Sequence, residues 1–286
     1  MKQISIIAAK GGVGKTMLTA AFASLAKNLV LVDCDTESRD LSVFLNAEYK
    51  EEQKVDTIQR VAIAEDECIR CGLCKAMCHF DAVINPYGVY QIKEEHCQAC
   101  DLCLNACPVS AIDHVKSEQN KWGVAATRFG DVYNAQLALG EDLNGKLISI
   151  IREKAQEQAL AEAKDLVLID GPPAVGFAIA STIAGVDVAV LVLEPTPSAI
   201  SDLQKSKQLT ERYEVPMVCL LNKSDLNPEM ALQVKEYCGE NEIPLIGEIL
   251  FDSLFIESQM VGQTVVEFAP DSETTNLLKK SFEAIL

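Results

Sequence analysis

Residues 4–16 read ISIIAAKGGVGKT, an apolar run followed directly by a glycine-rich loop. A buried strand that leads into such a loop, with a helix behind it, lets successive backbone N–H groups converge on phosphate. Glycines allow the backbone to pass close to the anion, because they carry no Cβ. In this pattern the lysine neutralises the phosphates and the following threonine ligates Mg²⁺. The predicted nucleotide-binding residues are therefore Gly11, Gly12, Val13, Gly14, Lys15 and Thr16.

The loop departs from the strict G-x-x-x-x-G-K-[ST] pattern at its first position, where Ala9 replaces a glycine. A second lysine, Lys10, opens the loop instead. A chance match in a protein without a nucleotide is the alternative interpretation. The strand before the loop and the helix after it argue against that alternative.

Short apolar runs alternate with segments of helical period along most of the chain, which is typical of βαβ units and a parallel sheet. The predicted core strands are 4–8, 29–32, 166–169, 186–193, 217–221 and 245–249. The predicted helices are 15–26, 146–163, 198–212, 229–238 and 274–286. The fold class is therefore α/β, a P-loop NTPase with a mostly parallel sheet flanked by helices. Ligands of such folds bind at the carboxyl ends of the strands.

Residues 61–116 interrupt this alternation and contain eight of the eleven cysteines. A shift of 29 residues aligns CIRCGLCKAMCHFDAV with CQACDLCLNACPVSAI, with all four cysteines in register. We therefore predict a larger domain in two parts, 1–60 and 117–286, around an inserted small α+β domain at 61–116.

Each half of the insertion spells C-x2-C-x2-C-x3-C, the spacing of two-cluster ferredoxins, in which the fourth cysteine of each run ligates the other cluster. This predicts two [4Fe–4S] clusters, one on Cys68, Cys71, Cys74 and Cys107, the other on Cys78, Cys97, Cys100 and Cys103. A pair of structural zinc sites is the alternative, but zinc favours two C-x2–4-C pairs separated by a longer loop. The other cysteines, Cys34, Cys219 and Cys238, are predicted to be small buried residues.

The composition indicates a globular protein, because 49% of the residues are hydrophobic and 23% are charged. The formal net charge of −17 makes nucleic acid and an electrostatic membrane dock poor partners. The longest apolar run, 186–193, is too short to span a bilayer. The first residues lack the features of a signal peptide, so we expect a reducing, cytoplasmic location.

Several blocks of the sequence are similar to one ATPase family. They are KGGVGKT (10–16), VLVDCD (30–35), LVLIDGPP (166–173), EPTPSAISDL (194–203) and CLLNKSDL (219–226). The loop with its extra lysine resembles that of the MinD/Mrp-like (SIMIBI-type) P-loop ATPases, a family that includes the nitrogenase iron protein. With the insertion, nearly the whole chain resembles MinD-superfamily ATPases that contain a ferredoxin-like domain.

The resemblance implies roles for five residues. Lys10 is similar to the lysine that reaches across a dimer to the partner's nucleotide, and Asp35 to the residue that orients the attacking water. Asp33, Asp35 and Asp170 resemble acids of the Mg²⁺ shell, and Asn222 resembles the residue that reads the base. For Asp33 and Asp35 a solvated turn is the alternative, but a carboxylate pair just past a buried strand favours function.

These roles imply Mg²⁺-dependent hydrolysis of ATP to ADP that is slow without a partner. They also imply a nucleotide-dependent homodimer, or a heterodimer with a related ATPase. Residues 222–225, NKSD, are also similar to the guanine-reading motif of GTPases, which leaves the base open. Asp40 falls in the region of the first switch segment.

Two functions remain open from the sequence. In the first, ATP binding and hydrolysis are coupled to electron transfer by the two clusters to a redox partner. In the second, the protein assembles or carries iron–sulfur or other metal cofactors for an accepting partner, at the expense of ATP. Eight cysteines that complete two ligand sets leave no labile position evident, which favours electron transfer.

Overall fold

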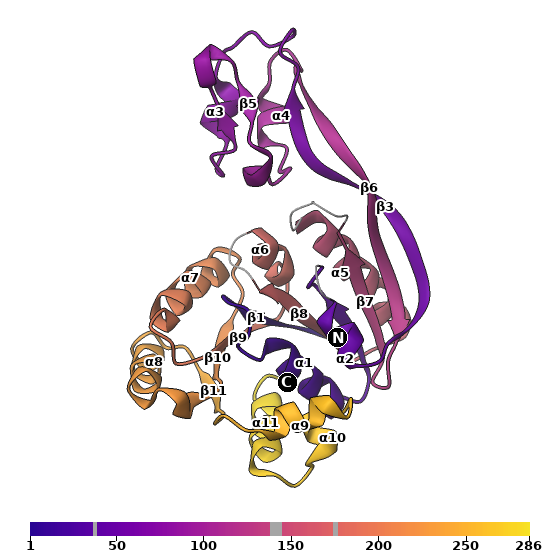
Figure 1. Cartoon of the computed structure of the whole chain (residues 1–286), viewed down its shortest axis with the longest axis vertical. Helices are drawn as coiled ribbons and strands as arrows, with labels where there is room; N and C mark the ends of the chain where they lie inside the picture. Colours follow the sequence, from indigo (N-terminus) through magenta and orange to yellow (C-terminus); the bar gives the residue numbers. More distant parts are fainter. Residues whose placement is uncertain (37–38, 138–144, 174–176) are drawn as a thin grey trace.

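The computed structural model describes residues 1–36, 39–137, 145–173 and 177–286 (Figure 1). Its largest element is a nine-stranded sheet within this part of the chain, in the order β11-β10-β9-β1-β8-β2-β7-β6-β3. The strands from β11 to β7 are parallel to one another, while β6 and β3 are antiparallel to their neighbours. The parallel strands are β1 (Lys2–Ala8), β2 (Leu29–Asp33), β7 (Asp131–Gln136), β8 (Leu166–Pro173), β9 (Val188–Leu193), β10 (Met217–Leu221) and β11 (Leu245–Glu248). The predicted α/β fold with a mostly parallel sheet is thus confirmed.

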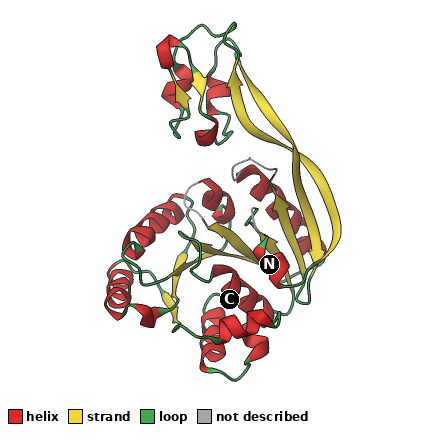
Figure 2. Ribbon diagram, viewed as in Figure 1, coloured by secondary structure: helices red, strands yellow, loops and turns green. Residues whose placement is uncertain are grey.

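Helices cover both faces of the sheet (Figure 2). One core is formed with α5 (Gly145–Ala161), α6 (Phe177–Ile183), α7 (Ala199–Arg212) and α8 (Pro228–Glu240). The other is formed with α1 (Lys15–Leu25), α2 (Asp40–Phe44), α9 (Leu254–Met260), α10 (Val265–Phe268) and α11 (Glu273–Glu283). Alternate residues of a strand serve the two cores, since Val30 and Val32 of β2 face the first and Leu29 and Leu31 the second.

The last helix, α11, packs inward against the second core. Its Phe282 stacks on Phe22 of α1 at a ring-centroid distance of 5.5 Å. Leu278 is fully buried, and Ile285 just beyond the helix is 2% exposed. This helix therefore closes the second core.

Two long strands, β3 (Glu48–Ile63) and β6 (Ile112–Ala126), form an arm that leaves the edge of the sheet. Residues 121–126 of β6 pair with β7, and β3 pairs with β6 as far as Ile63 and Ile112. The arm connects the main body to a small lobe, residues 64–111 (Figure 1). The predicted boundaries at 61 and 116 fall inside these two strands, because both run without a break from the sheet into the lobe.

The lobe contains α3 (Leu73–Met77), β4 (Val83–Ile84), η1 (Pro86–Gly88), β5 (Gln91–Ile92), η2 (Glu94–His96) and α4 (Leu102–Ala106). The sequence repeat is also a repeat of backbone conformation. Arg70, Gly72 and Asp81 have positive φ, and so do the residues 29 positions later. These are Ala99, Asp101 and Ser110. The two cysteine runs therefore fold in the same local way.

Only a small apolar cluster holds the described part of the lobe together. It consists of Val61, Cys74, Val83, Cys103 and Ile112. Two of these five are predicted cluster ligands. A unit of this size with so little apolar core requires additional cross-links for stability.

Candidate functional site

The glycine-rich loop joins β1 to α1 and has the backbone that its glycines permit. Gly12 and Gly14 have φ of +82° and +90°, a region that other residues rarely adopt. Gly14 also has no room for a side chain, because a Cβ there would lie 2.6 Å from Nδ2 of Asn222. Helix α1 begins immediately after it, at Lys15.

Asp170, near the carboxyl end of β8, organises the first residues of α1. Its carboxylate accepts hydrogen bonds of 2.8 Å from Lys15 Nζ and, on the other oxygen, from Thr16 Oγ1. Thr19, one turn further along α1, donates a third bond of 2.8 Å. Both partners of the Lys15–Asp170 ion pair are buried, so these extra bonds offset the cost of removing the charges from water. Thr19 is a residue of this site that sequence analysis missed.

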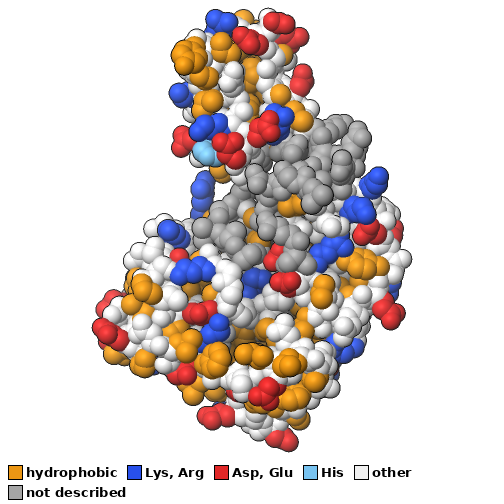
Figure 3. All heavy atoms as spheres, in the orientation of Figure 1, with side chains coloured by type: hydrophobic (Ala, Val, Ile, Leu, Met, Phe, Trp, Pro, Cys, Tyr) orange, Lys and Arg blue, Asp and Glu red, His pale blue; other side chains and the backbone are white. Residues whose placement is uncertain are grey.

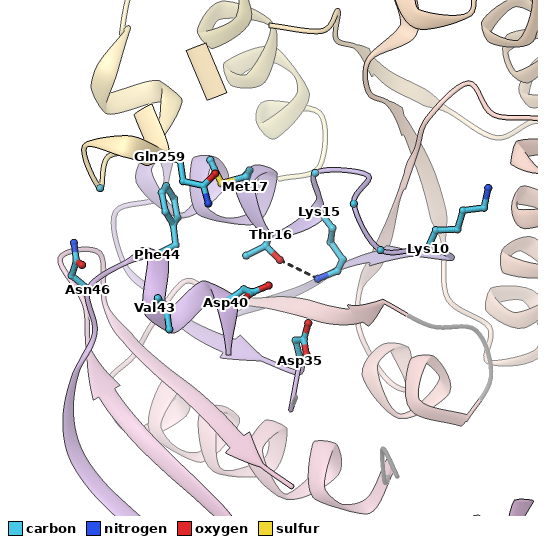
Figure 4. A pocket seen from close by; sticks show the side chains of 14 residues that line it. Lys10, Lys15, Thr16, Met17, Asp35, Asp40, Val43, Phe44, Asn46 and Gln259 are labelled. Carbon is cyan, nitrogen blue, oxygen red and sulfur yellow. Dashed lines mark hydrogen bonds between the residues drawn. The ribbon is translucent and has the colours of Figure 1, made fainter. Parts of the chain in front are cut away.

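A cavity of about 600 Å³ opens in front of the loop (Figure 4). The loop and Thr16 form one wall. The opposite wall is formed by Asp35, which follows β2, and by Asp40 and other residues of α2. Figure 4 shows Asp35 and Asp40 on the side away from the loop, below Lys15 and Thr16. Sequence analysis did not predict the remaining lining residues, which are Met17, Val43, Phe44, Asn46, Gln259 and Gly262.

Asp33, at the end of β2, is fully buried. Its carboxylate accepts bonds from the backbone N–H of Asp35 at 3.2 Å and of Ser42 at 3.3 Å. Burial, together with the nearby Asp170 charge, raises the pKa of Asp33 to about 7, against the lowering effect of Lys15. Asp33 therefore fixes the chain between β2 and α2, while Asp35 reaches the cavity.

Lys10 points away from Lys15 (Figure 4). Its ammonium donates a 2.9 Å hydrogen bond to Thr196 Oγ1 and lies 3.4 Å from Asp202 Oδ2. Asp202 belongs to α7 and Thr196 to the loop before it. In the single chain Lys10 is thus held beside α7, outside the group around Asp170.

The NKSD segment supports the loop from behind. Asn222 Nδ2 donates to Val13 O at 2.9 Å, and Lys223 Nζ donates to Gly12 O at 3.0 Å and to Glu194 at 3.1 Å. The Asp225 carboxylate accepts a bond of 2.5 Å from the backbone N–H of Phe251. These contacts place Asn222 at the loop, and its predicted role in reading the base stays a prediction.

The cysteine runs of the lobe come together in part. One cavity is lined by Cys68, Cys71, Cys74 and Cys107, the four residues predicted for one cluster. The backbone N–H groups of Ala82 and Ala111 donate to Cys78 Sγ at 3.4 Å and to Cys107 Sγ at 3.3 Å, two bonds related by the repeat. Across the residues the structure describes, no three or more Cys, His, Asp or Glu side chains form a group arranged to hold a metal ion.

Burial governs the thiols inside and outside the lobe. Together with the neighbouring Cys97 and Cys100, it raises the pKa of Cys103 to about 11. The prediction for the cysteines outside the lobe is confirmed, since Cys34, Cys219 and Cys238 are all buried.

In the described ranges, no helix has the length and apolar character needed to cross a membrane. Residues 174–176, which directly follow the block LVLIDGPP (166–173), lie outside those ranges.

Comparison with known proteins places this site in context. Residues 4–265 match the family model described as the CobQ/CobB/MinD/ParA nucleotide binding domain. An uncharacterized protein of Methanocaldococcus jannaschii is 31% identical over 229 residues, which is 79% of each chain. The septum site-determining protein MinD of Synechocystis is 25% identical over 273 residues, 92% of this chain and 81% of that protein.

Solved structures show the same fold. MinD of Pyrococcus horikoshii in complex with Mg-ADP superposes with a TM-score of 0.58 at 19% identity, covering 99% of this chain and 95% of that chain. MinD in the MinC:MinD complex of Aquifex aeolicus gives a TM-score of 0.58 at 16% identity, with the same two coverages.

Proposed function

Since the chain belongs to the CobQ/CobB/MinD/ParA family of nucleotide-binding domains, we propose that it is a Mg²⁺-dependent ATPase whose lobe carries two [4Fe–4S] clusters. Nucleotide state would be coupled to electron transfer by these clusters. The observation that carries the ATPase part is the group of Lys15, Thr16 and Asp170, which lies at the carboxyl ends of β1 and β8 beside a cavity of about 600 Å³.

The residues around the cavity suit phosphoryl transfer, which needs charge neutralisation and a positioned water more than covalent help. Thr16 and Asp170 would hold Mg²⁺, which neutralises phosphate charge when bound. A triphosphate in the loop takes Lys15 as its counter-ion, so this lysine exchanges Asp170 for phosphate oxygens. Asp35 lines the cavity and is the residue that we assign to orient the attacking water.

ATP is the nucleotide that the contacts favour. A guanine-reading NKSD motif uses the carboxylate of its aspartate for the base. Here the Asp225 carboxylate already accepts a bond from the backbone of Phe251. MinD of Pyrococcus horikoshii, which has the same fold, was solved with Mg-ADP. Isothermal titration with MgADP and MgGDP tests this, and equal affinities would contradict the assignment.

Two features of the lobe support the clusters. The cysteines of one predicted ligand set, including the crossing Cys107, line one cavity, and the N–H···S bonds follow the 29-residue repeat. When bound, the clusters supply one-electron transfer. They would also act as the cross-links that the small apolar core of the lobe requires.

Anaerobic purification, followed by iron and sulfide analysis and EPR spectroscopy with and without MgATP, tests this proposal. We expect about eight iron and eight sulfide per chain, the content of two [4Fe–4S] clusters. Cys71→Ser should lower the iron content, whereas Cys238→Ala, a change outside the lobe, should not. Zinc in place of iron would contradict the cluster assignment and leave the ATPase assignment standing.

The alternative function is ATP-dependent assembly or delivery of iron–sulfur or other metal cofactors. The exposure of Cys71 in the lobe favours this alternative, because a departing cluster must be accessible to an acceptor. Incubation with an apo-ferredoxin separates the two functions. Transfer of iron to the acceptor during ATP turnover supports delivery, whereas clusters that stay bound and change potential with nucleotide support electron transfer.

A further inference from the structure

Helix α2 lies between the nucleotide cavity and the root of the arm, the part of β3 and β6 next to the sheet. One side of this helix contributes Asp40, Val43 and Phe44 to the lining of the cavity. The other side is buried, with Leu41 fully buried and Ser42 4% exposed. Strand β3 of the arm begins at Glu48, only a few residues after α2 ends. A ligand that moves α2 therefore acts directly on the root of the arm.

A chain of side-chain hydrogen bonds also connects α2 to the root of the arm. Ser42 Oγ donates to Asp33 Oδ2 at 3.4 Å and accepts a bond of 3.1 Å from Asn134 Nδ2. The other atom of this amide, Oδ1, accepts a bond of 3.3 Å from the hydroxyl of Tyr49. Asn134 lies on β7 and is 1% exposed, so its amide has no solvent to substitute for these partners.

Arg39 makes a second connection, between Asp35 and Tyr49. Its backbone N–H donates to Asp35 O at 3.1 Å, in the segment that lines the cavity. Its guanidinium donates to the Tyr49 hydroxyl at 2.6 Å and to Gln136 at 2.5 Å, and lies 5.6 Å from the centroid of the Tyr49 ring. A 3.7 Å ion pair with Glu52 extends the network along β3.

Both connections meet at Tyr49, and the arm leaves space for its ring. Gly123 of β6, which is paired with Glu52, lies next to the Tyr49 ring, and a Cβ there would approach this ring to 3.2 Å and the backbone oxygen of Glu51 to 2.9 Å. The tyrosine hydroxyl is at once a donor to Asn134 and an acceptor from Arg39, so loss of this one oxygen breaks both bonds.

We propose that Tyr49 is a positioning residue that couples occupation of the nucleotide cavity to the position of the arm, and with it the lobe. The coupling rests on the proposed function, since it requires a nucleotide between the loop and α2. Phosphate and Mg²⁺ next to Asp35 and Asp40 change the charge that α2 faces, and therefore favour one arrangement of α2 over another. The network transmits that difference because its buried members have fixed partners.

The chain carries its own reporter of this movement. Trp122 is the only tryptophan and lies on β6 at the root of the arm. It is 9% exposed, stacks on Tyr133 at a centroid distance of 6.2 Å and lies 5.8 Å from Lys154 Nζ. A shift of the arm changes this surrounding and hence the tryptophan emission.

The test compares the wild type with Tyr49→Phe, which keeps the ring and removes only the hydroxyl. Tyr87→Phe is the matched control, since Tyr87 is fully exposed in the lobe. Binding of MgADP and of a non-hydrolysable MgATP analogue is measured by calorimetry, and Trp122 emission is recorded in the same titration. Hydrogen exchange of peptides covering 48–63 and 112–126 provides a second measurement, and Arg39→Lys a second variant.

We expect the wild type and Tyr87→Phe to change emission and arm exchange on binding. Tyr49→Phe should still bind nucleotide but lose both responses, and Arg39→Lys should weaken them. Binding without any response in the wild type, or an undiminished response in Tyr49→Phe, would overturn the coupling. Absence of nucleotide binding in the wild type would instead overturn the proposed function on which it rests.

Discussion

In the buried pair of Lys15 and Asp170, the carboxylate compensates the charge of the lysine in the absence of a ligand. Lys15 is 6% exposed and would stand uncompensated without it. We expect Asp170→Asn to lower the free energy of unfolding of the nucleotide-free protein by about 3–5 kcal/mol, the usual cost of breaking a buried ion pair. Chemical denaturation measures this. Glu211→Gln, which breaks an exposed pair with Lys207, should change stability by less than about 1 kcal/mol. Similar losses in both variants would contradict the prediction.

Asp33 should contribute less to stability as the pH rises, which is the opposite of the usual effect of a carboxylate in a folded protein. Because burial raises its pKa from 3.8 to about 7, the native state holds a proton that the unfolded chain has released between these values. Its contribution to the free energy of unfolding therefore falls as the pH rises through this window. Asp33→Asn lacks this contribution, so its stability relative to the wild type should increase from pH 5 to pH 8. Urea denaturation without Mg²⁺ or nucleotide tests this, and parallel pH profiles would refute it.

Lys10 allows a test of the predicted dimer. It is held by Thr196 and Asp202 in the single chain, and we expect it to act on the nucleotide of a partner. Lys10→Ala should hydrolyse ATP on the order of 100-fold or more slowly, since cationic groups supplied in trans contribute at least that much. Asp35→Ala should also be slow, because it loses the residue that we assign to orient the attacking water. Mixed together, they should recover activity, because the intact site of the first variant receives Lys10 from the second. No recovery on mixing would show that Lys10 acts within its own chain.

Most of the elements with a buried stripe or run were predictable. Six of the seven parallel strands and the helices α1, α5, α7, α8 and α11 were predicted, because burial on one or both faces imposes a period on the sequence. The short strand β7 was not predicted, although four of its six residues are buried. The arm was not predicted, because its polar strand EYKEEQKVDTIQRVAI (48–63) carries a weak alternation that the periodicity does not distinguish from a loop. Its partner is β6, and the paired residues are between 49 (Ile63 and Ile112) and 78 (Glu48 and Ala126) positions apart. Such pairing is a property of tertiary contact.

The turns of the lobe permit a prediction at the same scale. Gly72 and Gly88 have φ of +82° and +84°, but only at Gly72 would a Cβ meet a neighbour, at 2.8 Å from the Tyr90 hydroxyl. Substitution by alanine should cost both sites about 1 kcal/mol for the left-handed backbone. Gly72→Ala should lose more, because Tyr90 must move. Hydrogen exchange of the lobe measures the difference, and equal losses would show that the contact with Tyr90 is unimportant.

For the whole molecule, the body and the lobe have separate cores. The two cores of the sheet contain residues of the arm root, such as Trp122 and Ala125, while a third cluster belongs to the lobe. Figure 3 shows hydrophobic side chains on the part of the body where α9 and α10 lie. Leu250, Phe251, Ile256, Met260 and Val261 are exposed in that region of the sequence. The surface of the body is thus not uniformly charged despite the net charge of −17.

Separate cores predict that the lobe can be removed. Ala64 N–H bonds to Ala111 O at 2.9 Å, so an Asn-Gly turn in place of residues 64–111 would close the arm as a hairpin. We expect this variant to fold, to bind MgADP and to contain no iron. Circular dichroism, calorimetry and metal analysis are the measurements. An insoluble or unfolded product would show that the body depends on the lobe.

The sequence by itself determined the local chemistry of this protein. The glycines of the loop, the pair Lys15-Thr16 and the spacing of two cysteine runs are contiguous patterns, and their chemistry depends on distances along a few residues. Only the tertiary structure decided that Lys15, Thr16 and Thr19 all donate to the Asp170 carboxylate, that α2 and α9 complete the cavity, and that Tyr49 joins α2 to the arm. These contacts join residues far apart in the chain, and burial and packing select their partners without leaving a periodic or spaced signal in the sequence.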